Sequence, residues 1–290
     1  MVLQGCYTAL TTPFVDGAVC YDTLASLVER QIAAGVDGVV PVGTTGESPT
    51  LSVAEHERVI SAVVETVGGR CQVFAGTGGN STAEALELTQ HAKDVGADGT
   101  LQVTPYYNKP TQEGLYRHFM KIADVGLPVM LYSIPGRCNV EIELETVARL
   151  AKHESIVAIK EAGGKVDQIS GLKQCCDLSL LSGDDALALP MMLMGATGLV
   201  SVTSNLLPAE MTALTHYALA GDYRAALEIH FNYYRLFGAL FAETNPVPVK
   251  AAMHALDLHG SDCRLPLAPM AEDNTKKLYQ QLAAVGLIGR

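Results

Sequence analysis

Short apolar runs alternate with amphipathic helical segments along most of this chain, and this alternation constrains the fold more than any other feature. Each run is five or six residues long and rich in strand-forming residues, and helical patterning separates one run from the next. The eight runs lie at residues 7–11, 38–43, 72–76, 99–104, 128–133, 156–160, 178–182 and 197–202. Eight strands that alternate with helices are the number required for a closed (β/α)8 TIM barrel, the fold that we expect.

An open, doubly wound sheet is the alternative fold for such a pattern. Its glycine-rich GxGxxG turn is missing after the first run, which favours the barrel. From about residue 208 onward the patterning is helical only. We therefore expect a catalytic barrel over residues 1–223 and a small C-terminal helical subdomain over residues 224–290.

Capping residues predict several helix boundaries. The segment 22–34 has a single apolar stripe, with Asp22 as its expected N-cap and Gly35 as its end. Two further helices are expected to begin with capping boxes, formed by Ser52 with Glu55 and by Ser81 with Glu84.

Charge and composition exclude several classes of protein. The chain has 20 basic and 31 acidic residues, a net charge of −11, which argues against binding to nucleic acid or to an anionic membrane. The uncharged stretch 186–209 is interrupted by Pro190, Gly195 and Gly198, so it predicts a buried helix, a turn and a strand and not a membrane span. No secretory leader is apparent at the N-terminus, and seven scattered cysteines without a CxxC pair favour a reducing compartment, the cytoplasm.

The run SIVAIK ends on Lys160, and this position raises a chemical question. Desolvation of an ammonium group is unfavourable, so a lysine at the end of a buried strand is shifted toward its neutral form. A neutral amine can attack a ketone to give a Schiff base, whereas a lysine with its ordinary pKa of about 10.4 is protonated and unreactive. The alternative interpretation is a lysine that flanks a strand and extends to solvent.

Other polar groups follow neighbouring runs, at the barrel end where active sites of this fold lie. The loop GTTGES at 43–48 offers amides and hydroxyls suited to a carboxylate, although such a sequence also suits a plain tight turn. Tyr132 ends the fifth run and could shuttle protons, unless it is an ordinary tyrosine at the core edge. Arg137 could bind a second carboxylate or form a loop salt bridge.

Seven motifs together resemble the dihydrodipicolinate synthase family of the pyruvate-dependent class I aldolase barrels. They occur in the family's order from about Gly5 to the end of the chain, without a large insertion. The motifs are GTTGESPTLS, AGTGGNSTAEALELTQ, VTPYYNKPTQEGLYRHF, LYSIPGR, IKEAGG, SGDDAL and NPVPVK. As a set they are highly specific for this superfamily.

The resemblance implies four catalytic residues. Lys160 matches the Schiff-base lysine that condenses with pyruvate, and Thr44 and Tyr132 match the hydroxyls that relay protons. Tyr107 matches the tyrosine that crosses a dimer interface to complete the relay of the neighbouring subunit. No metal or organic cofactor is implied, and the expected assembly is a homotetramer built as a dimer of dimers.

The resemblance also implies how substrates are held. Thr45 matches the residue that binds the pyruvate carboxylate, and Gly183 and Val200 match further substrate-binding positions. Arg137 matches the arginine that holds the carboxylate of L-aspartate 4-semialdehyde. The implied activity is that of a lyase, 4-hydroxy-tetrahydrodipicolinate synthase, in diaminopimelate and lysine biosynthesis.

A second site for the feedback inhibitor L-lysine is implied at a dimer interface. It would consist of Ser48, His56, Asn80, Glu84 and Tyr106. Glu84 and a neutral His56 could accept hydrogen bonds from an ammonium group. The alternative is that both are ordinary residues in the first turns of capped helices, where the helix dipole favours Glu84.

Two other functions stay open from the sequence. One is a different pyruvate-dependent enzyme of the same superfamily, such as N-acetylneuraminate lyase or a 2-keto-3-deoxy sugar-acid aldolase. Thr44 and Arg137 favour the synthase, whereas Cys138-Asn139 and Gly163 depart from its commonest pattern. The other is a non-catalytic barrel that senses a small acid, which would have no use for a desolvated lysine.

Overall fold

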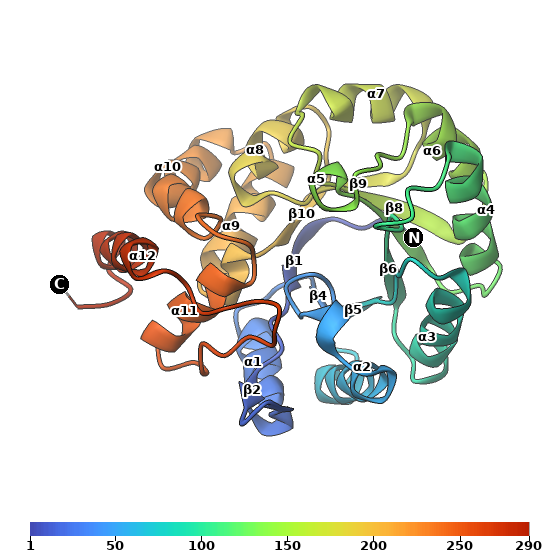
Figure 1. The fold of residues 1–290 in the computed structure, drawn as a ribbon. Coiled ribbons are helices and arrows are strands. Elements are labelled where there is room, and N and C mark those ends of the chain that lie inside the picture. Colours follow the sequence, from blue (N-terminus) through green and yellow to red (C-terminus); the bar gives the residue numbers. More distant parts are fainter. Residues whose placement is uncertain (290) are drawn as a thin grey trace.

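The computed structural model describes residues 1–289, and its centre is a closed barrel of eight parallel strands (Figure 1). Hydrogen bonding connects the strands in the order β1-β10-β9-β8-β7-β6-β5-β4, and β4 closes onto β1. The strands are β1 (Gly5–Ala9), β4 (Gly38–Val40), β5 (Gln72–Gly76), β6 (Gly99–Val103), β7 (Val129–Ser133), β8 (Ile156–Glu161), β9 (Ser179–Ser182) and β10 (Gly198–Ser201). The predicted (β/α)8 barrel is confirmed.

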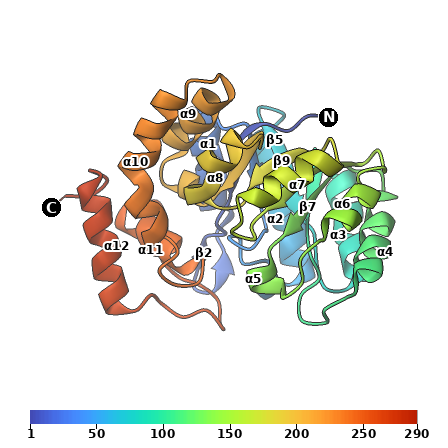
Figure 2. The same ribbon diagram turned by 90° about the horizontal axis from the view of Figure 1, so that it is seen from above.

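Helices surround the barrel, and at least one follows each barrel strand before the next begins (Figures 1 and 2). They are α1 (Tyr21–Ala33), α2 (Val53–Val67), α3 (Thr82–Asp94), α4 (Gln112–Ala123), α5 (Pro135–Cys138), α6 (Leu144–Leu150), α7 (Asp167–Cys175), α8 (Asp185–Leu193) and α9 (Pro208–Leu219). The uncharged stretch 186–209 contains most of α8 and all of β10, as predicted. Within residues 1–289, no helix combines the length and apolar character that a membrane crossing requires.

Three further helices lie to one side of the barrel (Figures 1 and 2). They are α10 (Tyr223–Ala239), α11 (Val247–Ala255) and α12 (Glu272–Ala284). One hydrophobic cluster joins α11 and α12 to Leu27 of α1 and to Val202 and Leu206 after β10. The proposed division of the chain at residues 223 and 224 remains a prediction.

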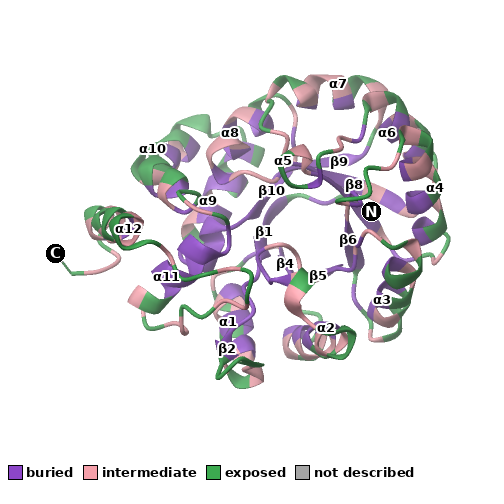
Figure 3. Ribbon diagram, in the orientation of Figure 1, coloured by how far each residue is buried: buried purple, intermediate pink, exposed green. Residues whose placement is uncertain are grey.

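Alternation of side chains along the barrel strands buries both strand faces, one in the barrel interior and the other against the helices. Tyr7, Phe74, Met130 and Val200 belong to the cluster that fills its interior, and strand neighbours such as Leu131 pack outward against helices. Both strand faces are therefore buried, which explains the continuous apolar runs in the sequence (Figure 3).

Two of the three predicted helix starts, at Ser52 and Ser81, are at the N-cap residue of their helix, but only Ser52 forms its predicted capping box, and the start predicted at Asp22 is wrong by two residues. The Ser52–Glu55 capping box at the start of α2 is confirmed by hydrogen bonds in both directions. Helix α1 begins at Tyr21 with Cys20 at its N-cap, so Asp22 lies in the first turn, where its charge favours the helix dipole. Ser81 is the N-cap residue of α3, but its side chain makes no capping hydrogen bond, so that predicted box is absent.

A short hairpin precedes α1 and was not predicted. It consists of β2 (Phe14–Val15) and β3 (Ala18–Val19), joined through Asp16 and Gly17 with φ values of +50° and +78°. An Asp-Gly pair between strand-like residues is a known hairpin signal, so this element could have been found. The run 38–43 contains only three strand residues, because the chain leaves the sheet at Pro41.

Candidate active site

Lys160 lies on β8, inside the barrel, beside Tyr132 of β7. The two residues are paired in register across the neighbouring strands, and the Lys160 Nζ lies 4.1 Å from the centre of the Tyr132 ring. Only 6% of Lys160 is exposed. Nζ makes no hydrogen bond to another group in the part of the chain that the structure describes, so little compensates an ammonium for its lost hydration.

Burial lowers the pKa of the Lys160 amine from 10.5 to about 7. The positive charge of Arg137 contributes in the same direction, whereas the buried carboxylate of Asp185 raises the pKa and limits the shift. A substantial fraction of the amine is therefore neutral near pH 7, the state that a nucleophile requires.

Tyr132 is also buried, and burial raises the pKa of its phenol to about 12. Interaction with the Thr44 side chain and the charge of Arg137 both oppose that shift. The phenol therefore keeps its proton at neutral pH and is available as a proton donor at the barrel mouth.

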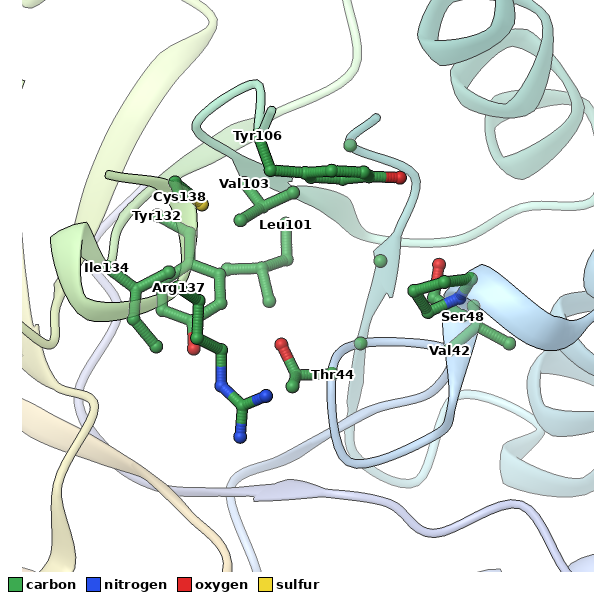
Figure 4. A pocket seen from close by; sticks show the side chains of 14 residues that line it. Val42, Thr44, Ser48, Leu101, Val103, Tyr106, Tyr132, Ile134, Arg137 and Cys138 are labelled. Carbon is green, nitrogen blue, oxygen red and sulfur yellow. The ribbon is translucent and has the colours of Figure 1, made fainter. Parts of the chain in front are cut away.

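A cavity of about 210 Å³ opens above these residues, between the loops that follow β4, β6 and β7. Figure 4 shows Tyr132 and Arg137 on one side of it and Thr44 on another, with the polar ends of all three directed into the same space. Lys160 and Thr45 are not among the residues that line this cavity, but the Lys160 Nζ lies 4.1 Å from the ring centre of Tyr132, which does line it. The cavity lining is Val42, Gly43, Thr44, Ser48, Pro49, Gly76, Gly78, Leu101, Val103, Tyr106, Tyr132, Ile134, Arg137 and Cys138.

The loop after β4 has the form expected of an anion-binding site. The amides of Gly46 and Ser48 donate to Gly43 O, and the amide of Glu47 donates to Thr44 O. The amides of Thr44 and Thr45 donate no hydrogen bond within residues 1–289, so two successive N–H groups remain free. Successive free amides at a turn form a concave site for a carboxylate.

A segment more than 100 residues away supports this loop and Arg137. Asn245 donates from Nδ2 to Thr45 Oγ1 at 2.9 Å, and Arg137 donates from Nη2 to the Asn245 carbonyl at 3.0 Å. Asn245 was not predicted as a site residue. The motif NPVPVK contained the signal, but nothing local in it indicates a contact with the barrel mouth.

The two further predicted substrate-binding residues are both near the site. Gly183 lies close to Lys160, and Val200 lies inside the barrel. A Cβ added to Gly183 would approach the Lys160 Cε to 2.8 Å, so the absence of a side chain there leaves room for the lysine. Val200 is buried in the cluster that also contains Tyr132 and Leu181, the strand partner of Lys160.

Tyr107 is the one predicted catalytic residue that lies outside this site. Its side chain is 90% exposed, and its φ of +73° is unusual for a residue with a Cβ atom. Within one chain it points to solvent, so its predicted role depends on a second subunit.

A second cavity of about 80 Å³ contains most of the predicted lysine site. Ser48, His56, Glu84 and Tyr106 line it, whereas Asn80 is not part of its lining. His56 Nε2 donates to Gly76 O at 2.7 Å, and burial lowers the pKa of this imidazole, which leaves Nδ1 as an acceptor.

No arrangement of three or more His, Cys, Asp or Glu side chains suited to a metal ion occurs in residues 1–289. Burial raises the pKa of the Cys138 thiol, which lines the larger cavity, to about 11. That thiol is therefore protonated at neutral pH and is a poor nucleophile.

Comparison with known proteins identifies relatives along the whole chain. The model of the dihydrodipicolinate synthetase family matches residues 2–285. A 4-hydroxy-tetrahydrodipicolinate synthase of Methanococcus maripaludis (strain C5) is 49% identical over 288 residues, which cover 99% of this chain and 100% of the relative. The corresponding enzyme of Syntrophobacter fumaroxidans is 52% identical over 291 residues, with the same coverage.

Two solved structures are similar in fold and carry small molecules. The chloride-inhibited dihydrodipicolinate synthase of Acinetobacter baumannii, complexed with pyruvate, has a TM-score of 0.96 and 44% identity, covering 98% of this chain and 99% of that one. The enzyme of Cyanidioschyzon merolae with lysine bound has a TM-score of 0.95 and 41% identity, with the same coverage.

Proposed function

Because this chain belongs to the dihydrodipicolinate synthetase family, we propose that Lys160 forms a Schiff base with pyruvate and that the product enamine condenses with L-aspartate 4-semialdehyde. The chain is thus a lyase of the 4-hydroxy-tetrahydrodipicolinate synthase type. The observation that carries the assignment of Lys160 is its buried amine, with a pKa of about 7, against the Tyr132 ring.

The first half of the reaction uses the loop after β4. The pyruvate carboxylate accepts hydrogen bonds from the free amides of Thr44 and Thr45, which directs the keto carbon toward Lys160. Neutral Nζ attacks that carbon, and the carbinolamine loses water to give a protonated imine. Tyr132, with Thr44 beside it, donates the proton that the departing hydroxide needs.

The second half forms a carbon–carbon bond. Tyr132, deprotonated by its donation to the departing hydroxide, takes a proton from the pyruvate methyl group to give an enamine. The enamine attacks the aldehyde carbon of the semialdehyde, and Tyr132 returns the proton to the aldehyde oxygen, which becomes a hydroxyl group. Arg137 binds the carboxylate of that substrate through its planar guanidinium. The substrate's amino group then displaces Lys160 from the imine, which closes the ring and regenerates the free amine.

Replacement of Arg137 by alanine tests whether this residue binds the semialdehyde and is not required for the reaction of Lys160 with pyruvate. We expect the Arg137→Ala variant to give the borohydride-trapped pyruvyl adduct at Lys160, whereas Lys160→Ala gives none. The kcat/KM of the Arg137→Ala variant for the semialdehyde should fall about 100-fold or more, since the carboxylate of that substrate loses a charge-assisted hydrogen-bond partner. Trapping without any turnover of the semialdehyde by the unaltered protein would point instead to a sugar-acid aldolase.

We also propose a homotetramer in the cytoplasm, built as a dimer of dimers in which Tyr107 completes the proton relay of a neighbouring subunit. The exposed Tyr107, held in a left-handed backbone conformation, supports a role across an interface. The seven cysteines, all free thiols, are typical of a reducing compartment.

Feedback inhibition by L-lysine is the remaining part of the proposal. The relative from Cyanidioschyzon merolae binds lysine, and the small cavity here offers the Glu84 carboxylate and a neutral His56. We expect Glu84→Gln to raise the lysine concentration for half-inhibition about tenfold or more, because it removes a charged acceptor for the ammonium. Wild-type activity unaffected by millimolar lysine in a coupled assay would contradict this part alone.

A further inference from the structure

A buried ion pair lies at the end of the anion-binding loop and has no role in the mechanism above. Lys250 Nζ donates to Glu47 Oε1 at 2.6 Å, and both side chains are fully buried. Glu47 directly follows the loop residues Gly43–Gly46, whereas Lys250 lies on α11, 203 residues later in the chain. A charge pair removed from water is costly to desolvate, so its presence at this position calls for a reason.

The pair joins four separate segments of the chain. Lys250 Nζ also donates to the Thr12 carbonyl at 2.9 Å, in the segment that follows β1, and lies 4.3 Å from the Phe14 ring centre. The second oxygen of Glu47 accepts a hydrogen bond from the Arg264 amide at 2.9 Å, in the segment before α12. Both carboxylate oxygens and the ammonium therefore have partners, which is what a buried pair requires to persist.

The backbone at Glu47 needs this support. Its φ of +58° and ψ of +37° place it in the left-handed region, which is unfavourable for a residue with a Cβ atom. Such a conformation persists only where the surroundings impose it. The amide of Glu47 donates to Thr44 O at 3.1 Å, so the turn at Glu47 and the position of Thr44 are directly linked.

We propose that Glu47 and Lys250 are positioning residues: their ion pair holds the 43–48 loop in the shape that presents the Thr44 and Thr45 amides to the pyruvate carboxylate. The C-terminal helices thereby form part of the substrate site without touching substrate. Asn245, on the same segment as Lys250, holds Thr45 Oγ1 and so reinforces the same loop. This inference rests on the proposed function for the identity of the anion.

Replacing both charged residues by neutral ones distinguishes a positioning role of the ion pair from a purely structural role. Lys250→Met alone leaves the Glu47 carboxylate buried and unpaired, so it should lower the unfolding temperature strongly. The double variant Glu47→Gln/Lys250→Met has no buried charge and should regain most of that stability. We nevertheless expect it to need about tenfold more pyruvate for half-maximal borohydride trapping at Lys160, with the maximal trapping rate nearly unchanged.

Amide hydrogen exchange measures the stability of the 43–48 loop directly and does not depend on Schiff-base formation at Lys160. The amides of residues 43–48 should exchange faster in the double variant than in the unaltered protein. Wild-type pyruvate dependence in a stable double variant would overturn the proposal, and so would unchanged exchange in the loop. If the unaltered protein forms no adduct, the Schiff-base function fails, and loop exchange alone then decides the inference.

Two further variants complete the design. If the double variant fails to fold, Glu47→Gln alone provides the test, because it removes the carboxylate charge while its amide oxygen and the Thr12 carbonyl still offer acceptors to Lys250 Nζ. Its folded fraction should show the raised pyruvate requirement, and a normal requirement would overturn the proposal. Glu29→Gln/Arg70→Gln neutralises an exposed pair of the same 2.6 Å length and should alter neither measurement.

Discussion

The chemistry of Lys160 follows from where its strand ends. β8 carries the amine into an apolar interior beside Tyr132. The sequence pattern predicted that a buried strand ends on this lysine, and the strand continues one residue further, to Glu161. The size of the pKa shift could not be predicted, because it depends on burial by neighbouring strands and on the charges of Arg137 and Asp185.

The pH dependence of imine formation tests this environment. Only the deprotonated amine attacks pyruvate, so the trapping rate should rise with pH through an apparent pKa of about 7 and become level above it. Arg137→Ala should move this apparent pKa upward, since it removes a positive charge that favours the neutral amine. A rate that continues to rise to pH 10 would mean that Lys160 has an ordinary pKa.

Most other site residues could also be predicted, because they follow strands of a recognisable barrel. Thr44, Tyr132 and Arg137 meet at one cavity, as expected from the rule that strand ends carry the active site. Asn80 is the exception in the second cavity: its carbonyl accepts a hydrogen bond from Asn108 Nδ2, and it does not line the cavity.

Helix α2 fixes the far side of the site loop. Its capping box satisfies two amides at its start, and Glu55 of that box also forms a 2.6 Å ion pair with Arg264. The hydrogen bonds from Arg264 are the main reason that the pKa of Glu55 falls to about 2. The same residues thus begin a helix and attach it to the C-terminal segment.

Removal of the cap should weaken α2 in a measurable way. Ser52→Ala is expected to destabilise the protein by about 1 kcal/mol, which a lower thermal midpoint would report, because one N-terminal amide loses its acceptor. Ser81→Ala is the matched control, since Ser81 occupies the same position in α3 without a capping bond. Equal losses in both variants would show that the cap at Ser52 contributes nothing specific.

The assembled chain exposes apolar side chains where neighbouring helices meet solvent. Phe231 and Tyr234 of α10 are 70% and 55% exposed, and Leu193 and Met194 at the end of the adjacent α8 are also exposed. A patch of this kind usually marks a protein interface. A dimer of dimers needs two different interfaces, and this patch supports the proposed tetramer by offering a second one in addition to the surface around Tyr107.

A charge placed in this patch should therefore reduce the assembly. We expect Phe231→Asp to convert a tetramer into a smaller species in sedimentation velocity, because a carboxylate would be buried without a partner. Val15→Asp, at an exposed apolar residue of the β2–β3 hairpin, should leave the sedimentation coefficient unchanged. A tetramer that persists in Phe231→Asp would exclude this patch as an interface.

The sequence by itself determined the barrel, the order of its elements and the principal residues of its mouth, because strand and helix patterns are local and strand ends meet at one edge. Only the tertiary structure decided that Asn245 and Lys250 reach back to the loop at 43–48, and that Ser52 caps its helix where Ser81 does not. The contacts of Asn245 and Lys250 depend on how distant segments are brought together when the barrel closes. The residue pattern within a segment does not indicate which distant segment it will contact, so the contacts of Asn245 and Lys250 with the 43–48 loop could not be predicted.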